Sequence, residues 1–152
     1  MKTIKSTSFM LFFIGTLFFS NQTMAQSEQS AEAKSSEKIP GKEKLVILWT
    51  SGDREVALKM VFMYTFNAKK RAWFDDITLV VWGPSAKLLT EDQELQDYLK
   101  EILDAGVTVK ACKGCSDQYG VSEQLEELGI NVLYIGEELS DYLKEDRKML
   151  TV

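Results

Sequence analysis

The sequence of 152 residues has no histidine, only two cysteines and only two prolines. Without histidine, the commonest general base and the commonest metal ligand are both missing. Any catalysis must therefore use thiol, hydroxyl, carboxylate, amine or backbone groups. Basic residues are also outnumbered, with 18 Lys and Arg against 23 Asp and Glu, and the net charge is −5. This acidic balance argues against non-specific binding of nucleic acids or anionic membranes, so we expect no nucleic-acid partner.

The N-terminal segment has the features of an export signal. Two lysines occur in the first five residues, and residues 9–19 form an apolar run. A transmembrane helix needs roughly 20 apolar residues, so a retained anchor is the weaker interpretation. Small side chains at Thr23 and Ala25 fit a cleavage site. We predict a signal peptide over 1–25, cleaved after Ala25, and a mature protein in the periplasm or outside the cell, with no membrane contact after cleavage.

The mature chain is predicted to contain one folded domain. Residues 26–43 are rich in Ser, Glu, Gln and Lys and offer little to bury, which is typical of a disordered linker. Residues 44–152 are long enough for a single domain with its own core.

The folded part alternates between short apolar runs and helical periodicity. The predicted strands are 44–49, 77–82, 107–112, 130–135 and 147–152. The predicted helices are 54–71, 85–104 with a break near 90–92 where Thr90 could cap a second helix, 121–128 and 136–144. Alternation of this kind predicts an α/β fold, a three-layer α/β/α sandwich around a mostly parallel five-stranded sheet. By analogy with flavodoxin-like folds, we expect the strand order 2-1-3-4-5.

Ligands in open α/β sheets bind beyond the carboxyl ends of the strands. The first three predicted strands end in turns rich in Gly and hydroxyl groups or in the cysteine segment, and they should be neighbours. We therefore predict a ligand-binding rim made of Thr50, Ser51, Gly52, Gly83, Pro84, Ser85, Lys113 and Gly114.

Several residues near this rim have a simpler structural interpretation. Trp49 and Trp82 are expected to pack at strand ends or between subunits. Ser51 or Asp53 is expected to cap the first helix. The acidic run 91–94 is expected to compensate the charge at a helix start.

The two cysteines, Cys112 and Cys115, form a Cys-x-x-Cys pair at the end of the third predicted strand. A position before a helix start, next to Lys113, favours the nucleophilic thiolate. A disulfide is an alternative in an exported protein, but it would close a loop too small to stabilise the domain much. A metal site is less favoured, because two thiolates provide only half of a zinc site and no histidine completes it. The catalytic candidates are therefore Cys112 and Cys115.

Three segments resemble the DsrE/DsrF-like (DsrE/TusD-type) sulfur-carrier family across essentially all of 44–152. They are WTSGDREVALKMVFMYTFNAKK, LVVWGPSAKLL and DAGVTVKACKGCSDQYGVSEQLEELGINV. Cys112 matches the family's persulfide-carrying position, with Gly120 eight residues later. Cys115 matches a second cysteine found in part of the family.

The resemblance implies a trimer, or a hexamer of stacked trimers, with the cysteine near a subunit boundary. It implies a persulfide on cysteine, a small sulfur donor or an acceptor protein as partner, and no metal or organic cofactor. The predicted export signal departs from the well-understood cytoplasmic relays. It places a tRNA role out of reach and makes a Cys112–Cys115 disulfide possible in the resting protein.

The resulting hypothesis is an exported sulfur carrier or sulfurtransferase, in which Cys112 is the nucleophile and Cys115 the resolving thiol. One alternative is a periplasmic thiol–disulfide redox protein. Another is a non-catalytic oligomeric module that binds a small ligand.

Overall fold

The computed structural model describes residues 43–145 and 147–152. The predicted signal peptide, and the predicted linker apart from residue 43, lie outside the described residues. Strands and helices alternate through the described part. The strands are β1 (Lys44–Trp49), β2 (Asp76–Val81), β3 (Thr108–Cys112), β4 (Asn131–Leu133) and β5 (Lys148–Thr151). The helices are α1 (Arg54–Val56), η1 (Ala57–Phe62), α2 (Met63–Lys70), α3 (Pro84–Glu91), α4 (Gln93–Asp104), α5 (Lys113–Tyr119), α6 (Ser122–Glu127) and α7 (Gly136–Lys144).

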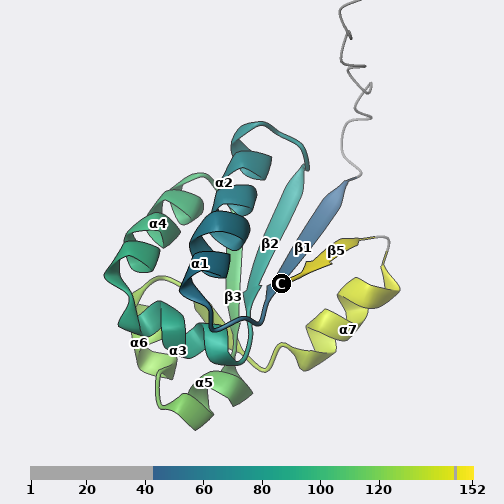
Figure 1. The fold of residues 1–152 in the computed structure, drawn as a ribbon. Coiled ribbons are helices and arrows are strands. Elements are labelled where there is room, and N and C mark those ends of the chain that lie inside the picture. The colour runs from purple at the N-terminus through teal and green to yellow at the C-terminus, as the bar shows by residue number, and fades with distance from the viewer. Residues whose placement is uncertain (1–42, 146) are drawn as a thin grey trace, which may run out of the picture. The chain divides into compact units, whose positions relative to one another are not determined.

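The five strands form one sheet with the order β4-β3-β2-β1-β5, and every pair is parallel (Figure 1). This confirms the α/β fold with a parallel five-stranded sheet. The predicted order 2-1-3-4-5 is wrong. Alternation of strands and helices determines that neighbouring strands are parallel, but it does not determine which strands are neighbours. The expected adjacency of β1, β2 and β3 still holds, with β2 between the other two.

The strand order explains which helices cover each face. The first three crossovers step in one direction, from β1 through β2 and β3 to β4. Right-handed crossovers that step the same way place their helices on the same face of the sheet. The last crossover runs back across the sheet to β5, so α7 lies on the opposite face, away from α2 and α4 (Figure 1).

The two faces carry cores of different size. The larger core includes Trp49, Phe62 and Leu99, packed between the sheet and the helices of the first crossovers. The smaller core, on the α7 face, consists of Val46, Val80, Cys112, Ile135 and Tyr142. Apolar side chains around this smaller core remain partly exposed, among them Leu48, Trp82, Leu133 and Met149. The α7 face is therefore the less completely covered of the two.

Helix starts follow the capping residues of the sequence. Asp53 begins the first helical segment, and its carboxylate accepts a hydrogen bond from the Val56 amide at 3.0 Å. The predicted break near 90–92 is confirmed, but the capping residue is Asp92 rather than Thr90. Asp92 has an extended backbone (φ −117°, ψ 109°) and accepts from the Leu95 amide at 3.0 Å. The acidic run is thus a helix start, as predicted.

Two helical features are absent from the sequence prediction. The first helix, predicted as regular, contains the π-helical segment η1 in its middle. Between β3 and β4 the sequence predicts one helix, and the structure has two, α5 and α6. Gly120 separates them with φ 71°, a left-handed conformation that glycine adopts without steric cost.

Within the described residues, no helix is both long and apolar enough to cross a membrane.

Candidate functional site

The two cysteines lie side by side where β3 passes into α5. Cys112 is the last residue of β3 and precedes the first residue of α5, and Cys115 lies in the first turn of that helix. Their Sγ atoms are 3.0 Å apart, and both thiols are free. A disulfide has an S–S distance of about 2.05 Å, so the pair is in contact without being bonded. The geometry brings both predicted catalytic residues together.

The two thiols differ in exposure. Cys112 retains only 8% of its accessible surface and packs in the smaller core with Ile135 and Tyr142. Cys115 is half-buried at the edge of that core. A reagent from solvent therefore meets Cys115 more readily than Cys112.

The expectation of a thiolate at Cys112 is wrong for the resting structure. Burial raises the pKa of Cys112 to about 11, and the hydrogen bond with the Cys115 sulfur acts in the same direction. The backbone N–H groups of Cys115 and Gly114 lower this pKa, but by less. Lys113 offers little help, because its ammonium group binds the Asp117 carboxylate at 3.2 Å. Cys112 is thus a protonated thiol at neutral pH.

The turns that follow β1 and β2 approach each other closely. A Cβ atom added to Gly52 would lie 3.1 Å from the Cβ of Pro84, so this contact leaves little room for a side chain at position 52. Pro84 begins α3, which in turn packs against α5. The three predicted rim segments therefore meet at the carboxyl end of the sheet, as the sequence predicts.

The hydroxyl groups of this rim are used within the fold. The Thr50 hydroxyl donates to the Val152 carbonyl at 2.9 Å, and the Thr50 amide donates to the same oxygen at 2.6 Å. The Ser51 hydroxyl accepts from the Asp53 amide at 3.1 Å. Ser85 is completely buried and is hydrogen-bonded to the main chain. These three side chains hold the rim together, which is the simplest account of their presence.

The glycines of the rim have different reasons for being glycine. Gly83 has φ 69° and ψ −132°, a conformation that other residues rarely adopt. Gly114, between the two cysteines, lies under the ring of Tyr134, whose Cε1 would be 4.0 Å from an added Cβ. Tyr134 is 72% exposed and is a rim residue that the sequence analysis does not identify.

A polar group on the α7 face is also absent from the sequence analysis. Lys110 of β3 forms a salt bridge with Glu138 of α7, and its Nζ lies 3.2 Å from the Tyr142 hydroxyl. Lys110 is two residues before Cys112, so both side chains lie on the same face of β3. Because side chains alternate between the two faces of a strand, the spacing of Lys110 and Cys112 could have placed both on one face from the sequence alone.

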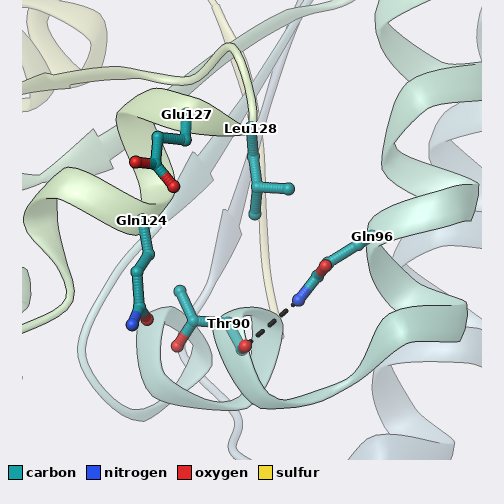
Figure 2. A pocket seen from close by; sticks show the side chains of 5 residues that line it. All are labelled: Thr90, Gln96, Gln124, Glu127 and Leu128. Atoms are coloured by element: carbon teal, nitrogen blue, oxygen red, sulfur yellow. Dashed lines mark hydrogen bonds between the residues drawn. The ribbon is translucent and has the colours of Figure 1, made fainter.

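An open pocket of about 350 Å³ lies away from the cysteines, among α3, α4 and α6 (Figure 2). It is lined by Thr90, Gln96, Gln124, Glu127 and Leu128. The side-chain amide of Gln96 donates to the backbone carbonyls of Leu89 and Thr90, both at 3.1 Å. None of the predicted site residues lines this pocket. Throughout residues 43–145 and 147–152, no three His, Cys, Asp or Glu side chains are grouped as metal ligands would be.

Comparisons with known proteins identify one family for this chain and structures with a similar fold. The model of the DsrE/DsrF-like family matches residues 43–152. The structure of BT1422, a conserved protein of unknown function from Bacteroides thetaiotaomicron, is 38% identical with a TM-score of 0.70, covering 72% of this chain and 95% of that one. The ychN protein from E. coli is 20% identical with a TM-score of 0.59, covering 72% and 99% respectively, and supports the fold alone. No curated protein matches the chain.

Proposed function

The chain belongs to the DsrE/DsrF-like family, and from this membership we propose that it is a sulfur-transfer protein that carries sulfane sulfur on Cys112. The observation that carries the proposal is the contact between two free thiols, 3.0 Å apart, at the carboxyl end of a central strand. Sulfur relay is a common role in this family, and a Cys-x-x-Cys pair at such a strand end suits it chemically.

The first step is loading of Cys112. Its thiolate attacks the sulfane sulfur of a donor such as thiosulfate, a Cys112 S–S bond forms, the donor S–S bond breaks, and sulfite leaves with the bonding electron pair. The thiol proton must leave before the attack. A donor with a longer sulfur chain reacts in the same way and releases a shortened polysulfide. Loading needs no metal and no organic cofactor.

Two fates then compete for the persulfide. An acceptor thiolate can attack the outer sulfur, which transfers that sulfur and returns Cys112 as a thiolate. Alternatively, the Cys115 thiolate attacks Cys112 Sγ, which forms the Cys112–Cys115 disulfide and releases hydrosulfide. A dithiol reductant must then restore the two thiols. The short distance between the sulfurs supports the second route, in which Cys115 is the proposed resolving thiol.

The rim residues Gly52, Gly83, Pro84, Gly114 and Lys113 are proposed to frame the approach of the donor. Thr50, Ser51 and Ser85 support these segments from behind through their hydrogen bonds to the main chain.

The remaining parts of the proposal concern location and assembly. We place the mature protein in the periplasm or outside the cell on the strength of the N-terminal sequence. We also infer a homo-oligomer, a trimer or a hexamer. The partly exposed apolar side chains on the α7 face, including Trp82 and Met149, support a contact between copies.

The test is the intact mass of the mature protein, purified without reductant, before and after exposure to polysulfide. The proposal expects a gain of one sulfur that reduction removes and that Cys112→Ser abolishes. In Cys115→Ser, the persulfide should persist longer, because the resolving thiol is missing. Sulfur uptake by Cys112→Ser equal to that of wild type would overturn the assignment.

Two further outcomes separate the alternatives, one in the mass experiment and one in a double variant. A mass two protons below the dithiol, unchanged by polysulfide, would favour a thiol–disulfide redox protein, to which the 3.0 Å contact is equally suited. Normal function of a variant with both cysteines changed to alanine would favour the non-catalytic binding module.

A further inference from the structure

A cluster of polar side chains links β3 to α7 on the less covered face of the sheet. Lys110 Nζ forms a salt bridge with Glu138 and lies 3.2 Å from the Tyr142 hydroxyl, which in turn donates to the Glu138 carboxylate. The cluster is shielded, since the Lys110 and Glu138 side chains retain 17% and 30% of their accessible surface. An ion pair in such a place interacts more strongly than one in open solvent.

This cluster adjoins the environment of Cys112. Side chains two apart on a strand point to the same face, with about 7 Å between their Cα atoms. Lys110 and Cys112 are therefore neighbours on the α7 face. Tyr142 belongs to both groups, because its hydroxyl binds Lys110 and Glu138 while its ring packs in the core that contains Cys112. One helix, α7, thus both covers Cys112 and provides Glu138.

We propose that Lys110 and Glu138 are positioning residues that set the ionisation of the Cys112 thiol through their mutual charge pairing. While Glu138 neutralises Lys110, no net positive charge favours a thiolate at Cys112. An unpaired Lys110 would favour it. The proposal deepens the sulfur-carrier function by assigning the control of its thiol, and it rests on that function only for its biological meaning.

Other charged groups around this face have partners of their own. The Arg147 guanidinium lies over the Tyr142 ring, 4.5 Å from its centroid, and binds Asp76 and Glu145 at 3.2 and 2.7 Å. On the α5 side, Lys113 is paired with Asp117. Cys115 touches Cys112, and the Tyr134 ring lies beside Gly114, between the two cysteines. Of these cations, Lys110 is the one that lies on the same strand and the same face as Cys112.

Chemically, burial and the Cys115 sulfur raise the pKa of Cys112 and keep the resting thiol protonated. Glu138 would prevent Lys110 from counteracting this effect, so the thiol stays protected. A protonated, buried thiol reacts slowly with oxidants and with unselective electrophiles. A persulfide carrier exposed to an oxidising compartment benefits from such protection, and loading then requires the thiolate to form in response to the donor.

The test measures the alkylation rate of Cys112 against pH in folded protein that carries Cys115→Ser, so that one thiol reports. Below its pKa, a thiol reacts in proportion to its thiolate fraction. Glu138→Gln leaves Lys110 unpaired and should raise the rate at neutral pH by about three- to tenfold, through a lower pKa. Lys110→Met leaves Glu138 unpaired and should lower the rate by about the same factor. The double variant is neutral at both positions, so its alkylation rate should be close to that of the parent protein.

Loosening of α7 without an electrostatic role has a different signature. It would expose Cys112 in both single variants, and because burial is the main cause of the raised pKa of Cys112, it would raise both rates and lower both midpoints. Rates that change in the same direction, or a double variant that keeps the shift of either single variant, would overturn the proposal. Ultraviolet absorbance of the thiolate, referenced to Cys112→Ser, gives the midpoint independently of reagent access.

Tyr142→Phe provides a packing control, because it keeps the ring over Cys112 and removes only a neutral hydroxyl. It should shift the midpoint less than either charge variant. Failure of sulfur uptake in the mass experiment would leave these alkylation results intact, so the two proposals fail separately.

Discussion

The hydroxyl of Ser85 donates a 2.7 Å hydrogen bond to the carbonyl oxygen of Trp49, 36 residues earlier in the chain. The same oxygen atom of Ser85 accepts from the Trp82 amide at 3.0 Å. One buried side chain therefore joins the ends of β1 and β2 beneath the rim on which the cysteine segment lies. It reinforces the 2.9 Å hydrogen bond that the Trp82 amide donates directly to the Trp49 carbonyl.

Replacement of this serine should cost stability and leave the chemistry intact. Ser85→Ala removes the two hydrogen bonds of the Ser85 hydroxyl, while the Trp82 amide keeps its 2.9 Å hydrogen bond to the Trp49 carbonyl, so we expect a cost of about 1 kcal/mol. We expect a lower free energy of unfolding by chemical denaturation. Ser140→Ala is the matched control, since that hydroxyl is exposed and binds only the Gly136 carbonyl of its own helix. Loss of sulfur uptake in a Ser85→Ala protein of unchanged stability would instead identify Ser85 as a ligand contact.

The layer architecture was predictable because it depends on local pattern, whereas the strand order was not. Apolar runs and helical periodicity are properties of short sequence segments, so each strand or helix can be predicted without knowing what it packs against. Strand order depends on which direction each crossover takes, and this is decided by packing between distant segments. The predicted order failed for that reason, although the adjacency of β1, β2 and β3 survived.

A second prediction concerns Gly83, which begins the turn into α3. With φ 69° and ψ −132°, it occupies a backbone region almost restricted to glycine, while nothing lies within 4 Å of an added Cβ. Gly83→Ala should therefore destabilise the protein by backbone strain alone, about 1–3 kcal/mol. Gly136→Ala is the control, because Gly136 begins α7 without a positive φ and also has open space around it.

The comparison of these two variants by denaturant titration separates strain from crowding. Gly136→Ala should be neutral or slightly stabilising, since alanine restricts the unfolded chain more than glycine does. Equal stability of Gly83→Ala and wild type would contradict the strained conformation.

A third prediction concerns the start of α4. Asp92 accepts from the Leu95 amide at 3.0 Å and from the Arg54 guanidinium at 2.6 Å. Asp92→Ala removes the cap and should cost about 1 kcal/mol. Asp92→Asn keeps a capping oxygen and should cost less.

The stability of the protein at acidic pH should also depend on the Asp92 carboxylate. The Leu95 amide, with help from Arg54, lowers the pKa of Asp92 below its ordinary value. A carboxylate with a lowered pKa stabilises the folded state at neutral pH, and this contribution is lost as the pH falls below the unfolded value near 3.8. Wild type should lose more stability on acidification than Asp92→Asn. Parallel acid profiles for the two proteins would contradict the role of the carboxylate.

The site could be predicted only where neighbours in sequence are also neighbours in space. The spacing of Cys112 and Cys115 identified them, because a strand end and one helical turn are local features. The ionisation of Cys112 was predicted wrongly, since the helix start and Lys113 are visible in the sequence but the burial by α7 is not. Glu138 and Tyr142 come from 26 and 30 positions further along the chain, and only the last crossover brings them to this face.

The buried thiol leads to a prediction at high pH. The pKa of Cys112 is about 11 in the folded protein against an ordinary value of 9.0, so the folded state holds a proton that the unfolded state releases. Stability from this group is complete below pH 9 and is lost as the pH rises through 11. We expect reduced wild type to lose about 2 kcal/mol more than Cys112→Ser across this range, measured by denaturant titration at a series of pH values. The other titratable side chains are the same in both proteins, so the difference reports on the Cys112 thiol and its contact with Cys115. Identical pH profiles would mean that Cys112 ionises as freely in the folded protein as in the unfolded chain, and the protection of the resting thiol by α7 would then be wrong.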